Sequence, residues 1–163
     1  MSANPRFRIR NATLALILSL GSVAVAAAAD DRRAPGVPLL PAYRQECAAC
    51  HAAYPPGMLP AASWQRIVGN LSRHYGADAS LDAATANELS AWLTARAGTY
   101  KRVRGEAPPD DRITRSSWFI RKHNQVPAAT WKLSAVKVAA NCAACHPQAE
   151  RGDFNEHDIR IPR

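Results

Sequence analysis

Apolar residues between positions 61 and 97 recur at helical spacing in two blocks. The first block places four of them at i, i+3, i+4 and i+7, on one helical face: Trp64, Ile67, Val68 and Leu71. A Gly-Ala-Asp break follows at 76–78, and Ser80 is the predicted N-cap of a second helix that ends at about Ala97. The predicted buried stripe of that helix is Leu81, Ala84, Leu89, Trp92 and Leu93.

The rest of the chain is less periodic. Short helices are predicted at 42–51, 116–124 and 134–146, and the prolines of 54–60 predict a loop. Residues 98–116 combine glycine, proline and charge without an apolar period, which is typical of a linker. No segment alternates apolar and polar residues as a half-buried strand would. The predicted fold class is therefore mainly α, with long loops.

The N-terminus is typical of a signal peptide. Arg6, Arg8 and Arg10 precede an apolar run that ends in small alanines, and we predict that the segment 1–29 is removed by cleavage after about Ala29. The alternative is a retained membrane anchor, since the run at 12–29 is near the lower length limit for a span. Export would place the mature protein in the periplasm.

The net charge of +8 falls to +5 without the signal peptide, because the segment 1–29 holds three arginines and no acid. No dense basic tract with interleaved aromatic residues is present, which disfavours a nucleic-acid partner. A moderate basic excess is better suited to steering the protein toward the acidic surface of a protein partner.

All four cysteines lie in two copies of the pentapeptide CAACH, at 47–51 and 142–146. The pattern C-x-x-C-H is the attachment signature of c-type haem: two sulfurs form thioethers to the porphyrin, and the histidine becomes the proximal iron ligand. We therefore predict two covalently bound haems c. The cofactor-binding cysteines are Cys47, Cys50, Cys142 and Cys145. The proximal ligands are His51 and His146.

This interpretation also divides the mature chain. We predict haem-binding domains at 30–100 and 101–163, each of which is too small to be stable without a staple or a central apolar group.

Other uses of the cysteines are less consistent with the pattern. Disulfides form readily in exported proteins but need no histidine after each pair. A four-cysteine zinc site usually has its two pairs close together in the sequence, whereas most of the mature chain separates the pair at 47–50 from the pair at 142–145. A thioredoxin-like site would need a βαβ pattern, which is absent.

The sixth ligand of each iron is predicted from histidine spacing. His74 follows His51, and His123 precedes His146 by the same number of residues. Each motif therefore has one further histidine at a matched distance, after the first motif and before the second. Met58 would have to cross from one haem face to the other on a short Pro-rich loop, so we expect it to pack as an apolar residue. His157, in an acidic tail, is expected on the surface. Crossed pairing, with each distal histidine serving the other haem, would need longer reaches.

Two histidines on each iron predict a low-potential carrier, because the methionine ligand that raises the potential of a c-type haem is missing. The expected function is electron transfer, without a catalytic residue or a small-molecule substrate. One alternative is a dihaem peroxidase or reductase with one open iron. A second alternative is a gas sensor, although no linked output domain is visible.

The sequence resembles the dihaem cytochromes c of purple and related proteobacteria. The resemblance rests on CAACHAAYPPGMLPAASWQRI, LSRHYGADASLD, WFIRKH and NCAACHPQAERGDFNEHDIRIP, which sample most of the span from 47 to 162. It implies a two-domain fold, in which the first domain is similar to class I cytochromes c and the second is loop-rich.

The resemblance also implies ligands and partners. It implies proximal ligation by His51 and His146 and distal ligation by His74 and His123, whereas His157 matches no family ligand. The implied electron acceptor is a small periplasmic monohaem cytochrome that binds oxygen, and the implied donor is a membrane b-type cytochrome. The sequence does not predict the oligomeric state.

Overall fold

The computed structural model describes residues 38–100, 103 and 106–163. The predicted signal peptide at 1–29 lies outside these residues. Within the described part of the chain, no helix has the length and apolar character that a membrane span requires. All described residues belong to one compact unit, and the predicted division at residues 100 and 101 stays a prediction.

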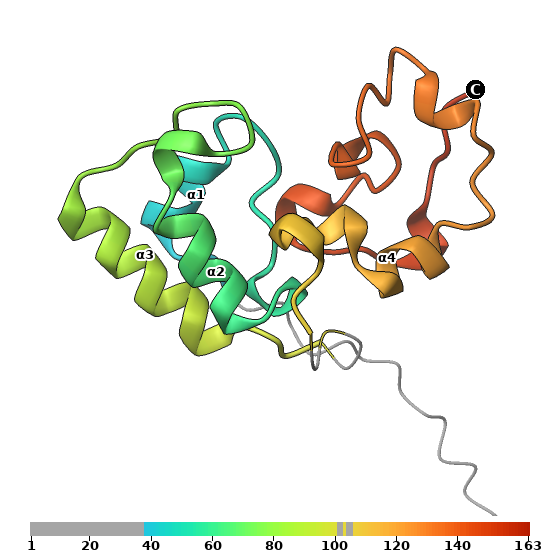
Figure 1. Cartoon of the computed structure of the whole chain (residues 1–163). Helices are drawn as coiled ribbons and strands as arrows, with labels where there is room; N and C mark the ends of the chain where they lie inside the picture. Colours follow the sequence, from blue (N-terminus) through green and yellow to red (C-terminus); the bar gives the residue numbers. More distant parts are fainter. Residues whose placement is uncertain (1–37, 101–102, 104–105) are drawn as a thin grey trace, which may run out of the picture. The chain divides into compact units, whose positions relative to one another are not determined.

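The structure is helical, as the sequence predicts. Its α-helices are α1 (Pro41–Cys47), α2 (Ala61–Val68), α3 (Ala83–Arg96) and α4 (Ser117–Lys122), which Figure 1 labels. Within the described ranges, eight short 3-10 helices lie between or after them: η1 (Pro56–Met58), η2 (Leu71–Arg73), η3 (Pro109–Asp111), η4 (Ile113–Arg115), η5 (Thr130–Lys132), η6 (Cys142–Ala144), η7 (Ala149–Arg151) and η8 (Glu156–Asp158). Among the described residues, the one β-type pairing is an isolated bridge between His74 and Ala77.

The three longer helices pack around an apolar core in the N-terminal half (residues 38–100), where α3 contacts both α1 and α2. The buried members of this core are Tyr43, Ala53, Leu59, Trp64, Leu89 and Leu93. Trp64, on α2, also donates a hydrogen bond from Nε1 to the carbonyl of Pro56 at 2.7 Å. This bond fixes the Pro-rich loop against the helix that follows it.

Two details of α3 differ from the sequence prediction. The N-cap is Asp82 and not Ser80: the Asp82 carboxylate accepts from the Thr85 amide at 3.0 Å, whereas Ser80 donates its own amide to Asp78. A carboxylate at this position satisfies an amide of the first helical turn. Ala84 is exposed, so the buried stripe consists of Leu89 and Leu93, with Leu81 and Trp92 partly buried beside them.

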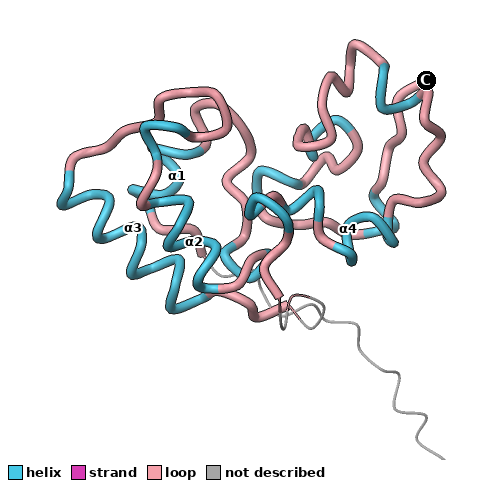
Figure 2. The backbone as a smooth tube through the Cα atoms, in the orientation of Figure 1, coloured by secondary structure: helices cyan, strands magenta, loops and turns pink. Residues whose placement is uncertain are grey.

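The C-terminal half (residues 106–163) is built mostly from loops and single helical turns, which Figure 2 shows as long pink stretches between short cyan ones. The predicted helix at 116–124 is present as α4, which is capped by the Ser116 hydroxyl. The predicted helix at 134–146 is wrong, since this segment forms successive turns and then η6. Lys137 has φ of 63° there, in the left-handed region that interrupts an α-helix.

Candidate functional site

The first CAACH motif and His74 come together in the N-terminal half. Cys47 ends α1, a tight turn carries residues 48–50, and His51 follows directly. His74 caps the C-terminal end of η2, on the loop between α2 and α3. The centres of the His51 and His74 imidazole rings lie 6.1 Å apart, and the ring planes are inclined by 21°. We call this pair the first site.

The second motif and His123 form a matching pair in the C-terminal half, which we call the second site. His123 follows the last residue of α4. His146 follows the single turn of η6, where its amide donates to the Cys142 carbonyl at 2.8 Å. The ring centres of His123 and His146 lie 6.2 Å apart, with planes inclined by 70°. Crossed pairing between the two halves is not the arrangement found.

Both separations match the space that a shared metal ion needs. A metal–imidazole bond is about 2.0–2.1 Å long, so two nitrogens on opposite sides of one ion lie about 4 Å apart and their ring centres about 6 Å apart. The pairs at 6.1 and 6.2 Å satisfy this requirement. The residues present therefore fit two haem irons, each held between two imidazoles.

Hydrogen bonds orient one histidine in each pair. His51 Nδ1 lies 2.7 Å from the Ala52 carbonyl oxygen, and His123 Nδ1 lies 2.9 Å from that of Phe119. Because a carbonyl only accepts, each ring donates from Nδ1 and leaves the Nε2 lone pair free for a metal. Such outer bonds fix the orientation of ligating histidines and raise their basicity. In the first site the bond falls on the motif histidine, and in the second site on the distal one.

The other two histidines are held in the neutral form that binds metals. Burial, the nearby His51 and the Arg112 guanidinium lower the pKa of His74. Burial and the nearby His123 lower the pKa of His146. His146 Nδ1 is buried without a hydrogen-bond partner among the described residues. Neutral imidazole carries the lone pair that a metal ligand needs.

No disulfide joins any of the four cysteines. Burial raises the pKa of Cys47 and of Cys142 to about 11, so neither is a reactive thiolate at neutral pH. Over the described ranges, no three His, Cys, Asp or Glu side chains gather into a common metal site. The structure therefore does not bring the two Cys pairs together in the way that a four-cysteine zinc site requires.

Aromatic side chains surround both histidine pairs, and the sequence analysis above did not assign them to the sites. Tyr54 stacks on His51 at 4.8 Å, and Tyr75 meets His74 edge-on at 5.0 Å. In the second site, Phe119 stacks on His123 at 3.9 Å. Trp131 and Phe154 complete this second group, beside His123 and His146 respectively. Adjacency to a motif histidine or a distal histidine could have indicated Tyr54 and Tyr75, but nothing local marks Trp131 or Phe154.

An apolar hollow of about 590 Å³ opens in the C-terminal half, and its lining includes Pro127, Leu133 and Ile161. Thr130 and Leu133, which lie on either side of Trp131 in the sequence, also line it. The Trp131 indole packs beside His123. None of His123, His146, Cys142 and Cys145 belongs to this lining.

Two candidates, Met58 and His157, belong to neither pair. Met58 is 5% exposed within η1, on the Pro-rich loop, and His74 is the residue placed opposite His51. His157 is exposed on η8.

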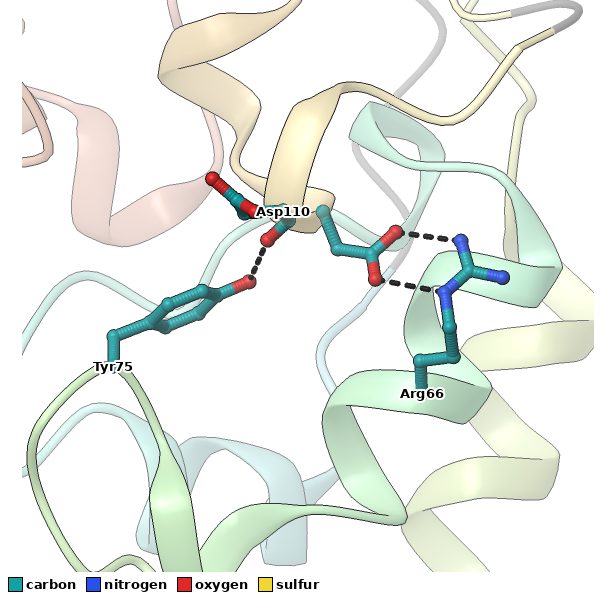
Figure 3. A network of polar contacts seen from close by, with 4 residues as sticks. Arg66, Tyr75 and Asp110 are labelled. Atoms are coloured by element: carbon teal, nitrogen blue, oxygen red, sulfur yellow. Dashed lines mark hydrogen bonds and ion pairs between the residues drawn. The ribbon is translucent and has the colours of Figure 1, made fainter.

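A polar network of Arg66, Tyr75, Asp110 and Asp111 lies next to His74 (Figure 3). The Tyr75 hydroxyl donates to the Asp110 carbonyl at 2.9 Å, and Arg66 forms a two-pronged ion pair with Asp111 at 2.7 and 2.8 Å. Together with His74, these residues line a pocket of about 230 Å³. Residues 108–115, predicted as part of a linker, therefore contribute directly to the surroundings of the first site.

Comparison with known proteins agrees with this geometry. Residues 43–154 match the family described as dihaem cytochrome c, DHC. A crystal structure of DHC purified from Rhodobacter sphaeroides is 39% identical, with a TM-score of 0.63, and the match covers 72% of this chain and 99% of that one. A second diheme cytochrome c structure from the same organism is 40% identical, with a TM-score of 0.65, over 72% of this chain and 98% of that one.

A third match comes from another organism. The X-ray structure of the diheme cytochrome type c sb-DHC from Shewanella baltica OS155 is 34% identical, with a TM-score of 0.66, over 77% of this chain and 95% of that one. No protein with a curated description matches the chain.

Proposed function

Because this chain belongs to the dihaem cytochrome c family and therefore carries two covalently bound c-type haems, we propose that it is a periplasmic, low-potential electron carrier. Membership of the family makes it an electron-transfer cytochrome. The proposal adds the iron ligands, the potential, the location and the partners. The observation that carries it is the presence of two separate histidine pairs, each with the spacing of one shared ion.

In this proposal each half of the chain binds one haem. Cys47 and Cys50 hold the first haem, and His51 and His74 ligate its iron. In the second half, Cys142 and Cys145 form the thioethers. The ligands of the second iron are His146 and His123. Supporting this assignment, His51 and His123 donate from Nδ1 to backbone carbonyls and leave Nε2 free.

An iron with all six ligand positions filled favours electron transfer over catalysis, because no position is open for a substrate. When bound, each haem would supply a one-electron change of oxidation state, and the protein's residues would hold the irons and exclude water. Without a methionine ligand, both potentials are expected to be low. The hydrogen bonds that Nδ1 of His51 and of His123 donate act in the same direction, because a more basic imidazole stabilises the ferric state.

Location and partners follow from the sequence and the family resemblance. A charged N-terminus followed by an apolar run and small alanines is typical of export. The proposed acceptor is a small oxygen-binding monohaem cytochrome c, and the proposed donor is a membrane b-type cytochrome. The basic excess of the mature chain favours an acidic docking surface on the partner.

The decisive experiment is spectroscopic. The mature protein, isolated from the periplasm, should contain two haems per chain in a pyridine haemochrome assay. Both ferric irons should be low-spin in electron paramagnetic resonance (EPR), and carbon monoxide should leave the absorption spectrum of the reduced protein unchanged. Rapid binding of carbon monoxide, cyanide or peroxide at one iron would instead identify an open site and support a dihaem peroxidase or reductase.

A further inference from the structure

A cation lies one aromatic ring away from the distal ligand of the first site. The Arg112 guanidinium carbon lies 4.2 Å from the centre of the Tyr75 ring, in cation–π geometry. The Tyr75 ring in turn meets the His74 imidazole edge-on, at 5.0 Å between centres. Arg112 therefore belongs to the immediate surroundings of the first iron, although α3 and the segment after it separate Arg112 from His74 in the sequence.

Tyr75 is held in place from both sides. Its backbone has φ of 52°, in the left-handed region that a bulky residue rarely adopts. Its hydroxyl donates to the Asp110 carbonyl, which ties the loop of His74 to residues 108–115 (Figure 3). A side chain fixed in this way is a stable platform for the guanidinium.

The charge of Arg112 is not cancelled by its neighbours. Two carboxylates are close by, but each is already occupied: Arg66 binds Asp111 through two hydrogen bonds, and Arg115 forms an ion pair with Asp110. Among the described residues, Arg112 itself has no ion pair. The three arginines and two aspartates named here therefore carry a net charge of +1.

The second site has no equivalent in the part of the chain that the structure describes. The ring packed on the distal ligand His123 is that of Phe119. The neighbouring Lys122 is paired with Glu156, and Arg121 lies on the exposed side of α4. Among the described residues, no cation lies over the aromatic rings that pack against His123.

We propose that Arg112, held on the face of Tyr75, raises the reduction potential of the first haem relative to its potential without this charge. One-electron reduction of that iron, from ferric to ferrous with the electron supplied by a redox protein partner, removes one positive charge from the site. A fixed cation nearby destabilises the ferric state more than the ferrous state. This inference rests on the proposed function, since it requires a haem between His51 and His74.

The test compares two variants at Arg112 with a matched control. Arg112→Gln removes the charge, Arg112→Lys keeps it, and Arg121→Gln removes one exposed positive charge close in sequence to the distal ligand of the second site. The readout is an EPR-monitored redox titration of the holoprotein. The two ferric signals are assigned beforehand with the variants His74→Ala and His123→Ala.

Arg112→Gln should lower the potential of the first haem alone, by a threefold to tenfold change in its oxidised-to-reduced ratio, or roughly 28–59 mV for one electron. Arg112→Lys should retain most of the wild-type potential, and Arg121→Gln should leave the first haem unchanged. The shift should shrink at high salt, because exposed charges are screened.

Two results overturn the inference. One is an unchanged first potential in Arg112→Gln, and the other is an equal shift of both haems. If the variant keeps two low-spin irons, either result contradicts the role of Arg112 and leaves the proposed function intact. A high-spin or carbon-monoxide-binding iron in the wild-type protein would instead contradict the proposed function.

Discussion

The two halves of the molecule each bring a pair of histidines together, but they differ in the size of the apolar core around the pair. The N-terminal half has three packed helices and a contiguous core of six buried side chains. In the C-terminal half, the one α-helix has six residues, and the buried apolar residues among those described are Phe119, Val136 and Ala149. Both halves nevertheless place two imidazoles about 6 Å apart. The comparison indicates that the second half depends on its haem for a core more than the first does.

The histidine pairs differ as well. The rings of His51 and His74 are nearly parallel, whereas those of His123 and His146 are closer to perpendicular. The orienting hydrogen bond falls on the motif histidine in the first site and on the distal histidine in the second. Two haems with the same ligand set should therefore be distinguishable by stability, by potential and by spectrum.

The largest expected effect is on folding. The double variant Cys142→Ser/Cys145→Ser should lose its second haem and leave residues 106–163 without their central apolar group. We expect a loss of several kcal/mol, on the scale of about 2–5 kcal/mol for a lost covalent staple in a small domain. Hydrogen exchange measured by mass spectrometry should show lost protection throughout that half.

The matched control is Cys47→Ser/Cys50→Ser. Because α2 and α3 share a side-chain core, their amides should remain partly protected after the first haem is lost. Equal loss of protection in both halves, or greater loss in the first, would contradict the comparison.

The next effect is on the irons themselves. His74→Ala and His123→Ala should each convert one of the two haems to a high-spin, five-coordinate state that binds carbon monoxide. The potential of that haem should rise by an amount on the order of 0.1 V, within the range of about 0.8 V over which axial ligands tune haem. Absorption spectroscopy and redox titration measure both changes. If either variant keeps two low-spin irons, the assignment of that distal ligand is wrong.

Much of this arrangement could be predicted from the sequence. The two CAACH motifs and the equal spacing of His74 and His123 point to the four histidines that the structure places in two pairs, and their ligation of iron stays a prediction. The helical periodicity predicts α2 and α3. The reason is local: a C-x-x-C-H turn and an amphipathic helix are specified by residues close together in the chain.

What the sequence did not predict depends on long-range contacts. Residues 108–115 look like a linker, yet they place Asp110 and Arg112 on the loop of His74. The segment 134–146 has helical propensity but is bent by turns at Lys137 and before Cys142. In both cases tertiary packing overrides the local preference, and single-residue patterns carry no signal for it.

A smaller effect is expected in the EPR spectrum of the oxidised protein. Two nearly parallel imidazoles overlap with the same one of the two iron d orbitals of π symmetry, and this overlap separates the two orbitals in energy. Perpendicular imidazoles leave the two orbitals closer in energy, so less orbital angular momentum is quenched. The haem at the second site should therefore give the more anisotropic low-spin signal, with the larger maximum g value. The variant His123→Ala should remove that signal and His74→Ala the other one. The reverse assignment would contradict the ring angles of 21° and 70°.

The smallest effect concerns a bond that joins the two halves. Tyr54 stacks on His51 and donates from its hydroxyl to the Ala140 carbonyl at 2.8 Å, just before Cys142 in the sequence. Tyr54→Phe keeps the ring and removes this bond, so it should lower the free energy of unfolding by about 1 kcal/mol. In chemical denaturation followed at each haem, the unfolding midpoints of the two halves should also lie further apart than in the wild-type protein.

The matched control is Tyr43→Phe. It removes a hydroxyl hydrogen bond of the same length, to the Tyr54 carbonyl, within the N-terminal half. It should destabilise that half without separating the transitions. If Tyr54→Phe and Tyr43→Phe behave alike, the hydroxyl of Tyr54 does not couple the two halves, and their different stabilities arise from their cores alone.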